Sequence, residues 1–135
     1  MDMASIGNIT FACDDPTGLA RFWSGALGYV LQEVPPGFME AWIAEGRDPN
    51  GAAAAVDPEH MGPRLFFLKM KKRPAVEGTS IPIHLDLSAE DMEVEVERLT
   101  SLGAAVVETK TQKTGEWVET WTVMQDPEGN GFCVQ

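Results

Sequence analysis

Two stretches of the chain, NITFACDDPTGLARFWSGALGYVLQE (residues 8–33) and HLDLSAEDMEVEVERLTSLGAAVVET (residues 84–109), follow one pattern. Each begins with a short apolar segment, continues with apolar residues at helical spacing, and then reaches Leu-Gly and a second apolar segment. Asn8 and His84 are 76 residues apart (84 − 8), and Gly28 and Gly103 are 75 apart (103 − 28), so the second copy is one residue shorter. A repeat of this length predicts a duplicated strand–helix–strand unit.

Cap residues mark where the two predicted helices begin and end. In the first copy, Asp15 is a favourable N-cap, and Pro16 suits the first helical position, where its missing N–H costs nothing. In the second copy, Ser88 and Asp91 have the spacing of a capping box. The glycine of each Leu-Gly pair predicts the C-terminal stop. The apolar stripes that predict the buried helix faces are Leu19, Phe22, Trp23, Ala26 and Leu27 in the first copy and Met92, Val96 and Leu99 in the second.

The rest of the chain is typical of strands and turns. Residues 52–56 (AAAAV) are compatible with either an edge strand or a short helical turn. The other predicted strands are Tyr29–Val34, Phe38–Ala44, Arg64–Met70, Ala104–Thr109, Trp117–Gln125 and Gly131–Gln135. The order is then βαβββ twice, which predicts an α+β fold with the helices on the outer faces of curved sheets. We expect a single domain, with modules at about 5–72 and 80–135 and a linker at 73–79.

Length, charge and cysteine count narrow the functional class. The chain has 135 residues, of which 44% are hydrophobic and 23% charged, as in a globular domain. Its net charge of −11 argues against nucleic acid and anionic membrane as partners, because both are bound through clustered Lys and Arg. No apolar run is long enough to span a membrane, and the N-terminal residues lack the pattern of a secretory signal. With two cysteines and no disulfide framework, we expect a cytoplasmic protein with free thiols.

Strand side chains alternate between two faces, which separates candidate site residues from core residues. The apolar face that must pack under the helices is formed by Ile9, Phe11, Ile83, Leu85, Leu87, Phe132 and Val134. The opposite face carries Asn8, Thr10, His84, Asp86 and Cys133. These five polar residues are therefore the first candidates for a functional site.

Tryptophans add a second group of candidates. Trp42, Trp117 and Trp121 lie on predicted strands, and the last two are four residues apart (121 − 117), so they share a face in an unbroken strand. A site lined by Trp, Phe and Met with a few polar groups is typical for a planar or apolar small molecule. Core packing is the alternative, since Trp is highly buried on average.

Four segments of the chain carry a family resemblance: ITFACDDPTGLARFWSGALGY, GPRLFFLKM, IHLDLSAEDMEVEVERLTSLGA and the ending WTVMQDPEGNGFCVQ. Together they span nearly the whole chain and resemble the vicinal oxygen chelate superfamily, the glyoxalase/bleomycin resistance protein/dioxygenase fold. The greatest similarity is to bacterial glyoxalase-like domain proteins. The resemblance implies paired βαβββ modules whose eight strands form a curved cup, and a homodimer. It also implies that the strand at the C-terminus completes the cup.

The resemblance also bears on metal binding. Metal-dependent members of the superfamily carry a His in the first strand and a Glu in the last strand of each module. In this chain the four positions fall on Asn8, His84, Cys133 and one of Phe66, Phe67 and Leu68. His84 alone keeps the expected ligand type, whereas a catalytic divalent site needs about three protein ligands. The prediction is therefore a chain without a catalytic metal or other cofactor. The alternative is a divalent metal held by His84 with Cys133 or Asp86, because imidazole and thiolate suit Zn²⁺.

The predicted function is binding of an apolar or aromatic metabolite or drug, in the manner of bleomycin resistance proteins. The predicted ligand-binding residues are Asn8, Thr10, Trp42, His84, Asp86, Trp121 and Cys133. The acidic composition favours a basic or neutral ligand. One enzymatic alternative is a metal-dependent lyase, isomerase or dioxygenase of the glyoxalase type. The other is a metal-free enzyme with His84 as its catalytic general base. A structural histidine and a buried cysteine are the non-functional alternatives for His84 and Cys133.

Overall fold

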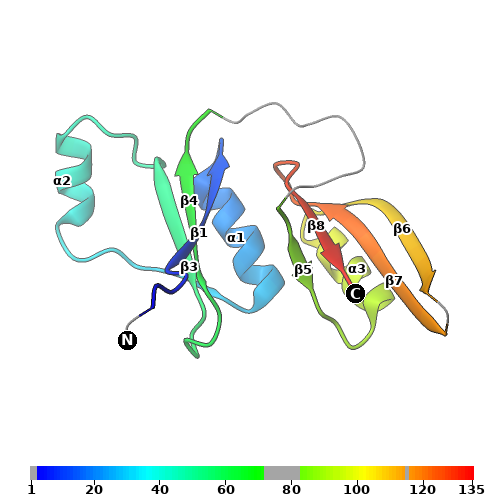
Figure 1. Cartoon of the computed structure of the whole chain (residues 1–135). Helices are drawn as coiled ribbons and strands as arrows, with labels where there is room; N and C mark the ends of the chain where they lie inside the picture. Colours follow the sequence, from blue (N-terminus) through cyan, green and yellow to red (C-terminus); the bar gives the residue numbers. More distant parts are fainter. Residues whose placement is uncertain (1–2, 72–82, 115) are drawn as a thin grey trace. The chain divides into compact units, whose positions relative to one another are not determined.

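A computed structural model describes residues 3–71, 83–114 and 116–135. The chain divides into two compact units, Met1–Arg73 and Pro74–Gln135, and each unit holds one copy of the repeat (Figure 1). The predicted linker at 73–79 lies outside the described residues. Among the helices of the described residues, none is long and apolar enough to cross a membrane.

The first unit is built on a four-stranded sheet, sheet 1. Its strands are β1 (Asn8–Cys13), β2 (Val30–Leu31), β3 (Ala52–Val56) and β4 (Arg64–Lys69), in the order β1-β4-β3-β2. β1 runs parallel to β4, and the other neighbours are antiparallel. The sequence leaves the AAAAV segment open between an edge strand and a short helical turn. It is a strand, and it is not at the edge of the sheet because β2 pairs with its outer side. The expected strand over Tyr29–Val34 is shorter, since only Val30–Leu31 has strand geometry.

The helix α1 (Pro16–Leu27) packs on one face of sheet 1, and its predicted caps are confirmed. The Asp15 carboxylate accepts a hydrogen bond from the Gly18 backbone N–H, and Gly28 ends the helix in the left-handed conformation with φ of 71°. The ring of Phe11 lies 5.5 Å from that of Trp23 and 5.1 Å from that of Phe67, measured between centroids. The members of the predicted apolar stripe that are buried are Leu19, Phe22, Trp23 and Ala26.

One predicted strand is a helix. The segment Phe38–Ala44 forms α2, which begins after Gly37 with φ of 83°. Its aromatic residues suggested a strand, but Phe38 and Trp42 are four residues apart and their rings meet at 5.9 Å on one side of the helix. All seven residues of α2 are at least partly exposed, so local spacing decides its structure rather than burial in a sheet. The placement of Trp42 on a strand is wrong for the same reason.

The second unit repeats the arrangement with sheet 2. Its elements are β5 (Leu85–Leu87), α3 (Met92–Ser101), β6 (Ala105–Thr114), β7 (Trp117–Gln125) and β8 (Gly131–Val134), and the strand order is β5-β8-β7-β6. β5 runs parallel to β8, as β1 does to β4. Asp91, not Ser88, caps α3, because its carboxylate accepts from the Val94 backbone N–H at 3.2 Å.

The C-terminal strand is placed by a tight turn and a packed core. The buried Asp126 carboxylate accepts from the backbone N–H groups of Glu128 and Asn130 at 2.9 and 3.0 Å, which fixes the DPEGN turn before β8. The fully buried residues of the second unit include Leu99, Met124, Phe132 and Val134. The tandem βαβββ modules of the predicted α+β fold are thus confirmed, with α2 as an addition to the first. The closure of the eight strands into one cup stays a prediction.

Candidate functional site

Each sheet has one face covered by its helix and one face directed away from it, which we call the distal face. In sheet 1 the distal face is formed by residues that alternate with the core: Asn8, Thr10, Gln32, Ala54, Val56, Arg64 and Phe66. In sheet 2 it is formed by Asp86, Lys110, Trp121, Val123 and Cys133, with His84 just before β5. The distal faces hold every polar residue that strand alternation singled out.

Three potential ligand groups meet on the distal face of sheet 2. Asp86 and Cys133 are direct register partners on the parallel strands β5 and β8. The Nε2 atom of His84 lies 3.3 Å from an Asp86 carboxylate oxygen, so the two side chains form an ion pair when the imidazole is protonated. One ligand atom from each of His84, Asp86 and Cys133 lies within 4.8 Å of the others. The structure thus brings together three residues that the sequence placed on one face.

Cys133 is the buried member of this cluster, with 5% of its surface exposed, while the His84 and Asp86 side chains are 32% and 51% exposed. Burial raises the pKa of the Cys133 thiol, the Asp86 carboxylate raises it further, and the Lys110 ammonium acts in the opposite direction. At neutral pH the group is therefore a thiol. This environment does not activate Cys133 as a nucleophile, which would require a lowered pKa.

Trp121 lies on the distal face of sheet 2. It pairs with Lys110 across β6 and β7, and it is two residues from Val123, the register partner of Cys133. The Lys110 ammonium is 3.1 Å from a Glu108 carboxylate oxygen, so its charge is balanced locally. The indole of Trp121 is partly exposed, whereas Trp117, farther along the same hairpin, is 73% exposed. Trp121 and Val123 form an apolar border beside the His84–Asp86–Cys133 cluster.

The distal face of sheet 1 carries a different set of groups, centred on Arg64. The Arg64 guanidinium donates from Nε to the Gln32 side-chain oxygen at 2.7 Å and from an Nη atom to the Asn8 side-chain oxygen at 3.0 Å. Its central carbon also lies 5.2 Å from the centre of the Phe66 ring. Arg64 was not predicted as a site residue. The signal in the sequence that could have identified it is its position in the predicted strand RLFFLK, where a charged residue is followed by apolar ones.

The register identifies the residue of sheet 1 that corresponds to Cys133. Asn8 is the repeat equivalent of His84, and Thr10 is therefore the equivalent of Asp86. Thr10 pairs with Phe66 on β4, as Asp86 pairs with Cys133 on β8. Of the three candidates named from sequence, Phe66 is thus the counterpart of Cys133. The sequence could not decide this, because it gave no strand register.

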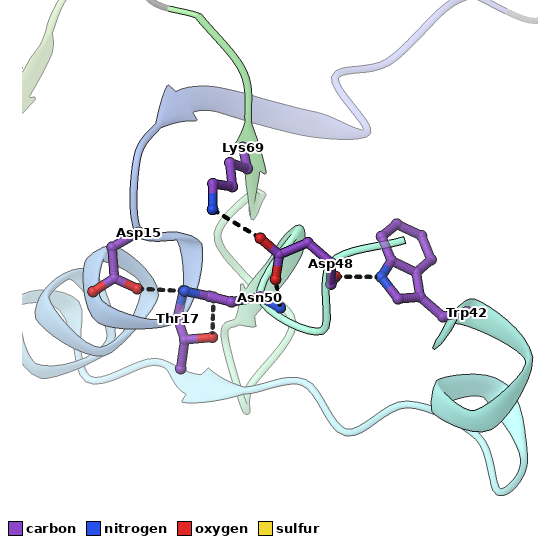
Figure 2. Close-up of polar contacts among 6 residues, drawn as sticks. All are labelled: Asp15, Thr17, Trp42, Asp48, Asn50 and Lys69. Atoms are coloured by element: carbon purple, nitrogen blue, oxygen red, sulfur yellow. Dashed lines mark hydrogen bonds and ion pairs between the residues drawn. The ribbon is translucent and has the colours of Figure 1, made fainter. Parts of the chain in front are cut away.

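Trp42 is not on either distal face. Its indole Nε1–H donates to the Asp48 backbone carbonyl at 2.5 Å, and the Arg47 guanidinium lies 4.7 Å above its ring. Figure 2 shows that Trp42 belongs to a polar network between the 46–51 loop, the start of α1 and the end of β4. In this network the Asp48 carboxylate is 2.8 Å from the Lys69 ammonium. The contacts of Trp42 therefore fix a loop.

Asn50 is the centre of the same network (Figure 2). Its side-chain oxygen accepts from the Thr17 backbone N–H at 3.0 Å and from the Thr17 hydroxyl at 2.6 Å. Its side-chain amide donates to the Asp15 carboxylate at 2.8 Å, and this bond is the main reason why the pKa of Asp15 lies below its ordinary value. Asn50 thus ties the loop before β3 to the N-cap of α1.

Comparison with known families decides the assignment. Residues 8–135 match the family described as glyoxalase-like domain. The chain belongs to the glyoxalase-like domain family. The predicted membership of the vicinal oxygen chelate superfamily is thereby confirmed. A search of the curated proteins found no match.

Several solved structures have the same fold as this glyoxalase-like domain. A glyoxalase/bleomycin resistance protein/dioxygenase family enzyme from Burkholderia phytofirmans PsJN has a TM-score of 0.63 at 15% identity, covering 97% of both chains. A mutant of the fosfomycin resistance protein FosX from Listeria monocytogenes, complexed with Mn(II) and 1S,2S-dihydroxypropylphosphonic acid, has a TM-score of 0.66 at 11% identity. The alignment with FosX covers 100% of this chain and 90% of the FosX chain. TioX from Micromonospora sp. ML1 has a TM-score of 0.56 at 16% identity, with 97% of both chains covered. At these identities the likeness shows the fold.

The metal positions of the superfamily can be tested against the residues of this glyoxalase-like chain. In sheet 1 the two positions hold Asn8, whose side-chain oxygen already accepts from Arg64, and Phe66, which offers no ligand atom. These residues do not fit a metal. In sheet 2, His84 and Cys133 with Asp86 offer three donors within reach of one ion. That set fits Zn²⁺, which accepts imidazole, thiolate and carboxylate ligands.

Proposed function

We propose that this glyoxalase-like protein binds small organic molecules on the distal face of one sheet or the other and does so without a catalytic metal. The residues that would contact ligand are Asn8, Thr10, Arg64 and Phe66 on sheet 1 and His84, Asp86, Trp121 and Cys133 on sheet 2. The proposal includes a homodimer in the cytoplasm. The family resemblance favours the dimer, and the free thiols of Cys13 and Cys133 suit a reducing compartment.

The observation that carries the proposal is the position of Arg64. Its guanidinium is held against Asn8 and Phe66, the two residues of sheet 1 at the metal positions of the superfamily. A permanent positive charge there disfavours a metal ion, because like charges repel. The same face combines an aromatic ring, small aliphatic side chains and a few fixed polar groups, as ligand sites commonly do.

The test is a ligand screen followed by mapping of the bound position. Uniformly ¹⁵N-labelled protein is mixed with pools of small apolar and aromatic molecules, and amide shifts are followed by NMR in the presence and absence of EDTA. We expect saturable shifts at distal-face residues that the chelator leaves unchanged. Binding that disappears with EDTA, or shifts confined to residues outside both distal faces, would refute the proposal.

The second candidate function is the metal-dependent one, and the His84–Asp86–Cys133 cluster favours it. A bound Zn²⁺ would act as a Lewis acid on a substrate oxygen, in the lyase or isomerase chemistry of the superfamily. The dioxygenase chemistry of the superfamily would need a redox-active divalent ion at the same residues, because Zn²⁺ has no redox chemistry. In this candidate, His84 and Asp86 contribute solvent-accessible ligand atoms, and Cys133 gives up its thiol proton when the ion binds.

A competition titration with a chromophoric zinc chelator separates the two candidates. The wild-type protein, Cys133→Ser and the control Cys13→Ser are compared, since Cys13 is buried on the α1 side of sheet 1. Withdrawal of one zinc ion per chain from the chelator by wild type and Cys13→Ser, but not by Cys133→Ser, would establish the metal candidate. Equal and negligible withdrawal by all three supports metal-free binding.

A further inference from the structure

We propose that Arg64 is an oxyanion anchor, so that the ligand of the distal face of sheet 1 is a small organic carboxylate or phosphate. This inference rests on the proposed binding function and names the chemical class of its ligand. It assigns the specificity for charge to one side chain.

The first argument is the geometry of the guanidinium. An arginine side chain has five N–H donors. Arg64 uses two of these donors, one in a hydrogen bond to Gln32 at 2.7 Å and one in a hydrogen bond to Asn8 at 3.0 Å. The bonds orient the guanidinium plane over the sheet, and the Phe66 ring supports it from one side at 5.2 Å. Three donors remain, and a fixed fork of donors matches the two oxygens of a carboxylate or phosphate.

The second argument is that the charge of Arg64 is not balanced by a carboxylate. Its hydrogen-bond partners are both neutral amides, and across the part of the chain that the structure describes no carboxylate forms an ion pair with it. The strands of sheet 1 contain one other charged residue, Lys69, and its ammonium is paired with Asp48 at 2.8 Å. A positive group on an otherwise uncharged sheet face is therefore left for an external anion.

The third argument is the surroundings of the guanidinium. Continuing the antiparallel register places Val56 beside Arg64, and Val30 pairs with Val56 on the next strand. Ala54 pairs with Phe66 and has no bulky side chain to cover the ring. An anion bound by Arg64 would therefore have its organic part over small aliphatic groups. This combination selects a compact organic acid over a free inorganic ion.

The experiment uses benzoate and phenyl phosphate as anionic probes and benzamide as the neutral analogue. Each is titrated into ¹⁵N-labelled full-length protein while the arginine Nε–H and backbone amide signals are followed. The variants are Arg64→Gln, Arg64→Lys and the control Arg21→Gln, which removes an exposed arginine of α1. Thermal unfolding of each variant shows that the fold is kept.

We expect at least one anionic probe to bind wild type and Arg21→Gln at least tenfold more tightly than benzamide does. Arg64→Gln should lose this preference, and Arg64→Lys should keep only part of it, because an ammonium lacks the planar fork. Equal binding of benzoate, phenyl phosphate and benzamide, unchanged in Arg64→Gln, would overturn the anion assignment and leave the proposed binding function intact. If neither anion binds but neutral ligands from the screen do, the anion assignment is likewise overturned and the proposed binding function is kept. Failure of every ligand would overturn both.

Discussion

Replacing Asn50 with alanine is the sharpest test of how the first unit is held together. The change removes the acceptor of two hydrogen bonds from Thr17, of 3.0 and 2.6 Å, which are partly buried. A protein hydrogen bond contributes about 0.5–1.5 kcal/mol net, so the two together contribute roughly 1–3 kcal/mol. The exposed side of the network weakens them, and we expect a loss of about 2 kcal/mol in the free energy of unfolding.

The assay is urea unfolding of wild type, Asn50→Ala, Thr17→Val and the double variant. If the Thr17 hydroxyl acts through Asn50, the losses in unfolding free energy of the two single variants should add up to about 0.5–1 kcal/mol more than the loss in the double variant. Asn50→Ala should also raise the pKa of Asp15 toward its ordinary value of about 3.9, because it removes the main bond that lowers that pKa. An Asn50→Ala loss below about 0.5 kcal/mol, or strictly additive losses, would refute this account of the network.

The Asp15 pKa also gives the pH dependence a sign. A carboxyl group with a lowered folded pKa contributes stability above its ordinary pKa, and the contribution is lost as pH falls through the folded value. The difference in stability between wild type and Asn50→Ala should therefore shrink as pH falls below about 4. Unfolding curves at a series of acidic pH values measure this. A difference that grows on acidification would contradict it.

Two further predictions test the face assignments. Phe67→Ala should lower the free energy of unfolding in urea by about 3–5 kcal/mol, because Phe67 is fully buried against Phe11. Phe66→Ala, on the distal face, should lower it by less than half as much. Equal losses for the two variants would show that the faces are misassigned. In a Cys13→Ser background, Asp86→Asn should lower the pKa of Cys133, because it removes a carboxylate that raises that pKa. Alkylation of Cys133 by iodoacetamide should then reach its half-maximal rate at a lower pH. An unchanged pH profile would show that Asp86 does not influence the Cys133 thiol.

The repeat made most of the fold predictable. Asp15, Pro16 and Gly28 gave both ends of α1, and strand alternation placed His84, Asp86 and Cys133 on one face. These features depend on local backbone rules, which the sequence carries directly. Ser88 was misread as a cap because Asp91, three residues later, competes for the same role.

Two kinds of feature were missed from the sequence: the local structure of one aromatic segment and the pairing between distant strands. The helix α2 was missed because aromatic residues favour strands on average, while the contact of Phe38 with Trp42 needs helical geometry. The role of Arg64 depends on Gln32 and Asn8, which lie on other strands of sheet 1 or next to them. The acidic composition favoured a basic or neutral ligand, but the local positive charge of Arg64 favours an anion. Over distances beyond about 8 Å salt screens the overall charge, so the local group has the larger effect on a bound ligand.

The metal content of the purified protein tests the central claim most directly. Native mass spectrometry of full-length protein prepared without chelator measures bound ions per chain. Metal-free binding predicts the mass of the bare chain, for wild type and for His84→Ala alike. A mass increase of about one divalent ion per chain in wild type, absent in His84→Ala, would contradict the claim and establish the His84–Asp86–Cys133 cluster as a metal centre.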